Sequence, residues 1–534
     1  MMFYTEPLPE PDPPLDKTEL ALIVFLTLAW MLPGLLGHEP WKPDEAYNFG
    51  LVRHMMESGN WLTFHLPDES PFASPPLYFM TAAVFGKLLS PILSLPDAMR
   101  LATGFYMGLA LIFIALSGRI LYGKGRYAVL ILAGSLGLLG HAHQLIPDSA
   151  LFAGCAMAIL GFSMIGKNSF GGVLAGTGMG IGFMSKGLIA IAYFFPILLI
   201  LPLMEKRGIS FLLAALLSLL PWGIWPYLLH LQHPALFEAW WKSSFSDTLG
   251  LASAPRRSLF FYPGTLAWFA WPTLPLAAVA LWRERTRLSD IGIRLPLLIF
   301  SVMLLVLVLT RTERELYAMP MLLPLSLLAT ASIARMRRSA ASAFNWFGIL
   351  TFGMMALLFW TGWIAMMTGH PAYIAARIHH YHPDFSGHFS FFPFLFASLV
   401  TLLWVFLVIR TEHNGVRAVI NWTSGIVMVW AILMTLWLPF LDSVKSYREM
   451  FLSMKKAMPH RYTCMKGRHL GDAQRAMLDY YLGIDTVKKG NCSLVLVQTV
   501  SSDRHRPEGL RKIWEGARAG DRKERYRLYE KGAE

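Results

Sequence analysis

The sequence predicts an all-α polytopic membrane protein of about 13 transmembrane helices, with periplasmic surface helices and a small C-terminal α/β domain. Hydrophobic residues make up 55% of its 534 residues and charged residues only 15%, and apolar runs recur along most of the chain. This composition excludes a soluble multidomain protein. The net charge of +13 fits membrane topology better than nucleic-acid binding, because the basic residues lie in short loops and in the tail, without interleaved aromatic residues.

The candidate spans follow from runs of about 20 apolar residues, the length that crosses a bilayer. They lie near residues 18–37, 96–118, 127–142, 148–165, 170–184, 187–203, 209–229, 260–282, 295–311, 315–334, 343–367, 390–410 and 418–440. Together these define a transmembrane domain over residues 18–440. Residues 1–17 are acidic and rich in proline, with no cleavage site after the following apolar run, so we expect a disordered cytoplasmic N-terminus and a retained first helix.

Loop charge sets the orientation, because Lys and Arg in short loops stay on the cytoplasmic side. With the N-terminus inside, the inner loops hold about fifteen Lys and Arg in roughly 48 residues, and the outer short loops about seven in roughly 69. This asymmetry predicts a multi-pass protein of the bacterial inner membrane. A long first loop at 38–95, a loop at 230–259 and the tail at 441–534 then face the periplasm.

The tail is long enough for a small soluble domain. Residues 469–484 have the pattern of an amphipathic helix and residues 492–500 that of a strand, while the charged residues 506–534 are expected to be partly disordered. Cys464 and Cys492 both lie in this tail, and a disulfide between them is possible in an oxidising compartment. The three cysteines have no zinc-site spacing.

The first loop carries the most informative motifs. Pro43, Asp44 and Glu45 suit a helix start, and Leu51 and its neighbours one turn later give an apolar face, so this helix should lie along the membrane surface. A second amphipathic helix begins after Pro75 and Pro76. The pattern therefore predicts a polar loop between two helices that rest on lipid, with two carboxylates at the membrane boundary.

These motifs resemble the GT-C superfamily of integral membrane glycosyltransferases, in the bacterial branch related to protein mannosyltransferases and to the aminoarabinose transferase of lipid A. The matching residues are Pro43-Asp44-Glu45, then Arg53, Met55, Ser58, Gly59, Trp61 and Leu62, then Phe72, Pro75, Pro76 and Leu77. Weaker matches follow at Pro147-Asp148-Ser149, Ser185-Lys186-Gly187, Arg256-Arg257 and the segment from Arg311 to Pro320 with its Tyr317.

The resemblance implies an inverting transfer from a polyprenyl-phosphate sugar. Asp44 and Glu45 are the candidate catalytic carboxylates, because an acceptor hydroxyl must be oriented and must lose a proton, directly or beside a divalent metal that Asp44 would bind. The candidates for binding the donor phosphate are Lys186, Arg256, Arg257 and Tyr317. Asp148 is the candidate residue for positioning the acceptor. No cofactor other than this metal is implied.

Each site residue also has a plainer interpretation. Asp44 could cap a surface helix, and Asp148 and Lys186 could be charges at span ends. Arg256 and Arg257 could be ordinary loop cations, and Tyr317 an aromatic residue of the membrane interface. GTGMGIG at 176–182 indicates close helix packing, not nucleotide binding, since it lacks the G-x-G-x-x-G spacing. His379, His380 and His382 are better explained as a solvated loop than as metal ligands.

The sequence also departs from the aminoarabinose transferases. Those proteins have Asp-Glu-x-Arg-Tyr where this chain has Tyr47-Asn48, and Phe-Glu-Lys-Pro where it has Phe72-Ala73-Ser74-Pro75. It therefore lacks a second acidic residue and a phosphate-binding lysine of that subfamily, so donor and acceptor cannot be copied from it.

We expect a glycosyltransferase that moves a sugar from undecaprenyl phosphate to a cell-envelope acceptor, which is lipid A, a glycan or a protein. Its partners are that donor lipid, the acceptor and membrane lipids, with no nucleic acid. A transporter or flippase of a lipid-linked sugar is the alternative, although no inverted repeat is evident and most charges lie at span ends. A structural membrane protein would leave the Asp-Glu loop unexplained.

Overall fold

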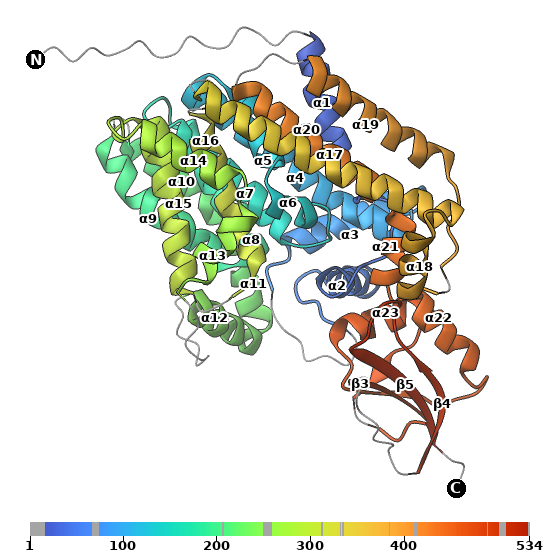
Figure 1. The fold of residues 1–534 in the computed structure, drawn as a ribbon. Coiled ribbons are helices and arrows are strands. Elements are labelled where there is room, and N and C mark those ends of the chain that lie inside the picture. The colour runs from blue at the N-terminus through green and yellow to red at the C-terminus, as the bar shows by residue number, and fades with distance from the viewer. Residues whose placement is uncertain are drawn as a thin grey trace, which may run out of the picture.

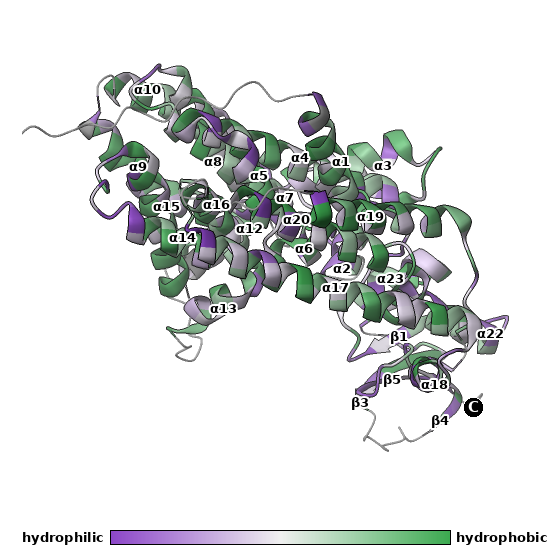
Figure 2. Ribbon diagram, turned by 45° about the horizontal axis from the view of Figure 1, so that its top comes forward, coloured by the Kyte–Doolittle hydropathy of each residue, from purple (hydrophilic) through white to green (hydrophobic). Residues whose placement is uncertain are grey.

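The computed structural model describes residues 17–66, 74–205, 208–248, 259–310, 313–331, 333, 336–383, 385–410, 415–488, 490–500 and 509–531. Over these residues the protein is a body of helices that ends in a five-stranded sheet (Figure 1). Helix α1 begins at one end of this body, and the sheet lies at the opposite end. Apolar residues dominate the helices, and polar residues gather around the strands (Figure 2). The N-terminal residues 1–16, predicted to be disordered, lie outside the described residues.

The helices of the first half are α1 (Lys17–Met31), α2 (Asp44–Ser58), α3 (Leu77–Leu89), α4 (Leu95–Tyr122), α5 (Gly125–Ala133), α6 (Leu136–His141), α7 (Asp148–Ser163), α8 (Phe170–Lys186), α9 (Leu188–Ile200), η1 (Leu201–Met204), α10 (Gly208–Leu219), η2 (Leu220–Gly223), α11 (Ile224–Gln232) and α12 (Pro234–Thr248). Those of the second half are α13 (Phe261–Phe269), α14 (Thr273–Arg283), α15 (Ile291–Leu309), η3 (Glu315–Met321), α16 (Leu322–Thr330), α17 (Arg338–Thr368), α18 (Ala372–Tyr381), α19 (Phe391–Arg410), α20 (Gly415–Leu433), α21 (Leu438–Lys445), α22 (Arg448–Ala457) and α23 (Asp472–Leu482).

Six of the described helical stretches are long and apolar enough to cross a membrane. They are α4, α10 with α11, α15, α17, α19 and α20. The pair α13 and α14, which is bent by 100°, makes a seventh if the two helices are counted as one span. The predicted span over 260–282 therefore falls on a bent pair of helices, which is either a broken span or a re-entrant loop. Pro272 stands at the break, where it supplies no backbone N–H to continue the first helix. The remaining predicted spans fall on shorter or interrupted apolar helices.

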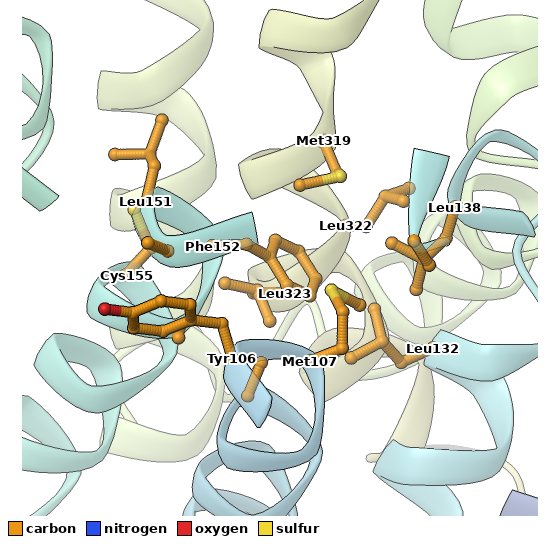
Figure 3. Packing of buried hydrophobic residues seen from close by; sticks show 14 of the residues in the cluster. Tyr106, Met107, Leu132, Leu138, Leu151, Phe152, Cys155, Met319, Leu322 and Leu323 are labelled. Atoms are coloured by element: carbon orange, nitrogen blue, oxygen red, sulfur yellow. The ribbon is translucent and has the colours of Figure 1, made fainter. Parts of the chain in front are cut away.

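A packed core links the elements that carry the predicted site residues. Leu151, Phe152 and Cys155 of α7 lie against Leu322 and Leu323 of α16, with Tyr106 and Met107 of α4 beside them (Figure 3). All of these side chains are buried. Because Asp148 begins α7 and Tyr317 lies within η3, just before α16, this core fixes the positions of both residues.

Glycines bring α7 and α8 into close contact, as GTGMGIG predicted. A Cβ on Gly178 would lie 2.5 Å from the backbone nitrogen of Ala158, and one on Gly154 would lie 2.7 Å from that of Gly182. Gly176 and Gly180 face the other way and leave room for α10 and Trp222. No side chain fits between these backbones. The antiparallel pair therefore brings the start of α7 and the end of α8 together.

Both helices predicted in the first loop are present. α2 begins at Asp44 and ends at Gly59, whose φ of +68° suits glycine, and α3 begins after Pro76. The expectation that the first of these helices rests on lipid is wrong, however. Leu51 and Met55 are buried inside the protein, and the opposite side of α2 packs against α23. The polar N-terminal half of α2 is thereby enclosed between the helical body and the tail.

The tail folds into a mixed sheet with strand order β2-β1-β3-β5-β4, as the α/β prediction required. The strands are β1 (Met465–Arg468), β2 (Thr486–Val487), β3 (Leu494–Val500), β4 (Leu510–Gly516) and β5 (Glu524–Lys531). β1 runs parallel to β2 and β3, whereas β5 is antiparallel to β3 and β4. A disulfide joins Cys464 to Cys492.

The prediction of disorder after residue 506 is wrong for residues 509–531. This segment forms the β4–β5 hairpin. Its charged residues surround an apolar stretch, in which Tyr526, Leu528 and Tyr529 are buried, and Arg527 between them is buried as well. The number of charges was misleading, and the apolar residues of β5 were the informative signal.

Candidate active site

Asp44 lies at the first position of α2, after Pro43, and its carboxylate points away from the helix backbone. The helix has no side-chain cap, so the plainer interpretation of Asp44 as a cap is wrong. Both carboxylate oxygens instead accept hydrogen bonds from Nη2 of Arg314, each at 3.0 Å. Asp44 and Arg314 are each close to half exposed, which leaves the pair accessible to a substrate.

Glu45 turns in a different direction and is buried. Its carboxylate receives Nε of Arg100 at 2.6 Å and the backbone N–H of Trp41 at 3.0 Å. Arg100 also donates to Asp97 and to the carbonyl oxygens of Leu35 and His38. The Glu45–Arg100 pair thus ties α2 to α4 and to the chain that leaves α1. Its geometry is that of a structural ion pair, without the exposure a reacting group needs.

Asp148 and Lys186 meet where α7 begins and α8 ends. Nζ of Lys186 lies 2.8 Å from Oδ2 of Asp148 and 5.4 Å from the centre of the Tyr317 ring. An acidic residue at a helix start and a basic residue at a helix end both complement the helix dipoles. The two side chains pair with each other inside the protein, so they are not charges extended from span ends toward water.

Two buried oxygens in this region have no hydrogen-bond partner among the described residues. They are Oδ1 of Asp148 and the hydroxyl of Tyr193. Leaving such a group unpaired costs free energy, about 1–3 kcal/mol for a buried polar atom.

The two clusters belong to one site. Arg314 stands just before η3, which carries Tyr317 and packs against α7. Arg314 interacts electrostatically with both Lys186 and Asp148. His141 interacts in the same way with the carboxylates of Asp44, Asp148 and Glu315. Four regions of the sequence, around residues 44, 141–148, 186 and 314–317, therefore contribute to this site. Arg256 and Arg257 lie outside the described residues, so their positions are not assigned.

An apolar groove of about 430 Å³ lies beside this site. Trp61 and Leu62 of the first loop, Pro76 before α3, and Trp222 and Trp225 line it. Met184, two residues before Lys186, also faces it. A groove with this lining suits a hydrocarbon chain whose polar end reaches Lys186.

Arg314, Arg100 and Tyr193 are site residues that the sequence did not identify. Arg314 falls within the segment 311–320 that carries Tyr317, but only the fold shows that it reaches Asp44. Arg100 and Tyr193 look like ordinary helix residues, and no local pattern marks them. Arg100 pairs with a residue 55 positions away, and the polar neighbours of Tyr193 come from several helices.

The described residues do not suit a divalent metal at Asp44. No group of three or more His, Cys, Asp or Glu side chains comes together in the described ranges. The charge beside Asp44 is that of an arginine, and Glu45 faces Arg100. His379 and His380 lie on α18, and neither belongs to such a group.

The chain is similar in sequence to curated arabinosyl transferases. It is 29% identical over 376 residues to "Undecaprenyl phosphate-alpha-4-amino-4-deoxy-L-arabinose arabinosyl transferase 2" of Pseudomonas fluorescens (strain Pf0-1), which covers 64% of each chain. A protein of Serratia proteamaculans (strain 568) with the corresponding name is 24% identical over 350 residues, or 58% of each chain. The matched region thus spans less than two thirds of the length of these relatives. No protein-family model matches the chain.

Solved structures agree with this similarity. ArnT from Cupriavidus metallidurans bound to undecaprenyl phosphate superimposes with a TM-score of 0.65 at 15% identity, over 96% of this chain and 98% of that one. The apo state of the same protein gives 0.65 at 16% identity, over 96% and 97%. The resemblance predicted from the first loop is confirmed: the chain has the fold of the solved ArnT structures, and its curated relatives are named undecaprenyl-phosphate aminoarabinose arabinosyl transferases.

Proposed function

We propose that the protein transfers a sugar from an undecaprenyl-phosphate carrier to a lipid acceptor of the cell envelope, with inversion at the anomeric carbon. The observation that carries this proposal is the convergence of an exposed carboxylate, Asp44, with the cations Arg314 and Lys186 at one site. The names of the curated relatives indicate an aminoarabinose donor, and lipid A is then the acceptor that such chemistry would serve.

The chemistry follows from charge and position. The acceptor hydroxyl oxygen forms a bond to the anomeric carbon while the bond from that carbon to the phosphate oxygen breaks. The hydroxyl proton passes to Asp44, and the leaving polyprenyl phosphate takes the bonding electron pair. Lys186 and Arg314 stabilise the negative charge on that phosphate, and Tyr317 stands beside Lys186.

The remaining residues position the substrates. Asp148 holds Lys186 and offers its unpaired Oδ1 to a sugar hydroxyl, whereas Glu45 acts through Arg100 to fix the start of α2. The apolar groove at Trp61 and Trp225 would take the hydrocarbon chain of one lipid substrate. Arg256 and Arg257 remain candidates for the phosphate. We derive no step through a metal, since the donor set at Asp44 does not suit one.

We place the site on the periplasmic face of the bacterial inner membrane, in a transmembrane domain of about thirteen spans over residues 18–440. The Cys464–Cys492 disulfide supports this side, because disulfides persist in oxidising compartments. The tail that carries it packs on α2, so the tail and Asp44 share one side. The alternative of a transporter has no observation in its favour.

The test is Asp44→Asn in purified protein reconstituted with undecaprenyl-phosphate aminoarabinose and lipid A. We expect transfer to fall by about 10²- to 10⁴-fold, the usual contribution of an acid–base group, with folding unchanged. The control is Glu57→Gln, an exposed carboxylate of the same helix whose ion pair, among the described residues, is with Arg53. Transfer at the normal rate by Asp44→Asn would overturn the proposal.

A further inference from the structure

A second pocket, of about 580 Å³, lies between the tail and the helical body. Tyr381 of α18, Val444 and Lys445 of α21, Lys42 of the first loop and the turn Arg518–Lys523 between β4 and β5 line it. Gly520 in that turn has a φ of +69°, and a Cβ there would lie 2.3 Å from the Tyr381 ring. The turn is therefore seated directly on α18.

The pocket carries an excess of positive charge. Its lining includes five basic side chains and one carboxylate, Asp521. Lys42 and Arg518 both reach Asp521 and also Glu524, so these two cations have counter-ions. The three that have no carboxylate within ion-pair distance among the described residues are Lys445, Arg522 and Lys523.

The contacts of these cations leave them available to an anion. Nζ of Lys445 lies 4.7 Å from the centre of the Trp41 ring, and Arg522 contacts Nε2 of His380 at 3.2 Å. Arg518 is buried, and its Nε has no hydrogen-bond partner in the described structure. Positive charge of this density in a recess suits an anion with several oxygens, and phosphate is the group that Arg and Lys bind best.

The pocket also lies at the level where a lipid headgroup would be found. α18 connects the regions of α17 and α19, and α21 follows α20, all three being helices long enough to cross the membrane. Figure 1 shows α18 and α21 between the ends of these helices and the sheet. A phosphate in the pocket would therefore lie at the membrane boundary. It would be near Lys42, which precedes Asp44 by two residues in the sequence.

We propose that this pocket binds the phosphate group of an anionic membrane lipid, at a site separate from that of Asp44 and Lys186. The proposal does not depend on sugar transfer. It gives the tail a role in holding a phosphorylated headgroup beside the first loop, and the turn Arg518–Lys523 supplies the specificity for anions.

The test measures lipid retained by the full-length protein in detergent, by native mass spectrometry, with phosphatidic acid or phosphatidylcholine added. We expect Lys445→Gln combined with Arg522→Gln to reduce phosphatidic acid binding about tenfold or more, since each basic residue near a charged headgroup contributes. The matched control combines Lys455→Gln with Lys456→Gln, two exposed lysines of α22 outside the pocket. Phosphatidylcholine binding should change in neither variant.

Adding inorganic phosphate separates the two sources of the anion. Competition at millimolar phosphate would support a site for the free ion as well as for the headgroup, whereas no competition would support the lipid alone. Equal phosphatidic acid binding by the pocket variant and the control would overturn the proposal. The same lipid-binding measurement is made on Asp44→Asn protein, without a sugar donor. Its result therefore does not depend on the transferase assignment.

Discussion

The adjacent carboxylates Asp44 and Glu45 have opposite environments. Neighbouring residues on a helix point about 100° apart, so one side chain meets Arg314 in the open site and the other meets Arg100 in the interior. The sequence could not separate them, because both appear as one acidic pair. Exposure and partner decide that Asp44 is available for chemistry and that Glu45 supports the fold.

Replacing Glu45 tests this separation. Glu45→Gln leaves Arg100 with a buried charge that only Asp97 offsets, and removal of one partner from a buried ion pair costs about 3–5 kcal/mol. We expect a clear fall in the thermal unfolding midpoint and in the amount of protein in the membrane. Asp44→Asn should show neither loss. A Glu45→Gln protein that is as stable as wild type but inactive would instead make Glu45 a reacting group.

Arg314 gives a second prediction at the residue scale. It contacts Asp44 through Nη2 alone, and its Nε and Nη1 have no hydrogen bond in the described structure, so one guanidinium can bridge Asp44 and a donor phosphate. Arg314→Lys keeps the charge but has a single nitrogen. We expect the transfer rate of Arg314→Lys to be about tenfold lower than that of wild type, since a hydrogen bond to a charged group contributes about 1.5–3 kcal/mol. The rate of Arg314→Gln should be lower still. Initial rates at varied donor concentration measure this, and equal activity of Lys and Arg at this position would contradict the bridge.

Among the elements, the α7–α8 pair leaves no room for a side chain at Gly178, because backbone meets backbone there. In Gly178→Val the new side chain would collide with α7 at the Ala158 nitrogen, only 2.5 Å from the Cβ. We expect a loss of about 1–3 kcal/mol of stability, as overpacking usually costs, and a larger loss of transfer because Asp148 and Lys186 move apart. Gly140→Ala is the control, since nothing lies within 4 Å of its Cβ. Unchanged stability and activity in Gly178→Val would show that this spacing is not required.

Elements with a strong local signal were predictable from the sequence. The starts of α2 and α3 follow from Pro43 and Pro76, and the alternating glycines of GTGMGIG are typical of closely packed helices. The bend between α13 and α14 was not predicted, because the apolar run over 260–282 is long enough for one span. The β4–β5 hairpin was not predicted, because its many charged residues are typical of a disordered segment. Of the site, Asp44, Asp148, Lys186 and Tyr317 could be proposed from motifs. Arg314 and Arg100 could not, since their roles depend on contacts between distant segments.

At the scale of the whole molecule, the tail packs as a clamp on α2, the helix that begins with Asp44. Arg53 of α2 pairs with Asp479 of α23 at 3.0 Å, and Phe49 meets the ring of Tyr480. A Cβ on Gly50 would lie 2.4 Å from that of Ala476, so the two helices touch closely. The tail therefore helps, through α23, to determine where α2, and with it Asp44, lies relative to the helical body.

Two carboxylates that repel each other, Glu39 of the first loop and Asp442 of α21, also lie where the tail meets the first loop. Oδ1 of Asp442 in α21 accepts hydrogen bonds from the backbone N–H of Glu39 at 3.0 Å and from Nε1 of Trp41 at 2.9 Å. Burial raises the pKa of Asp442 above its usual value, and burial together with the Asp442 charge raises the pKa of Glu39. In this pair the folded protein holds its protons more tightly than the unfolded chain does.

This arrangement predicts how stability varies with pH. A carboxyl group whose pKa is higher in the folded state contributes its stability below the unfolded pKa, near 4, and loses that contribution as pH rises through the folded value. Asp442→Asn keeps an oxygen acceptor for Trp41 but has no charge to lose. Its unfolding midpoint should therefore exceed that of wild type at pH 7, and the difference should shrink as pH falls toward 4. Thermal unfolding of both proteins across pH 4–8 measures this, and a wild-type midpoint higher than that of Asp442→Asn at pH 7 would mean that the hydrogen bonds of the charged carboxylate outweigh its burial.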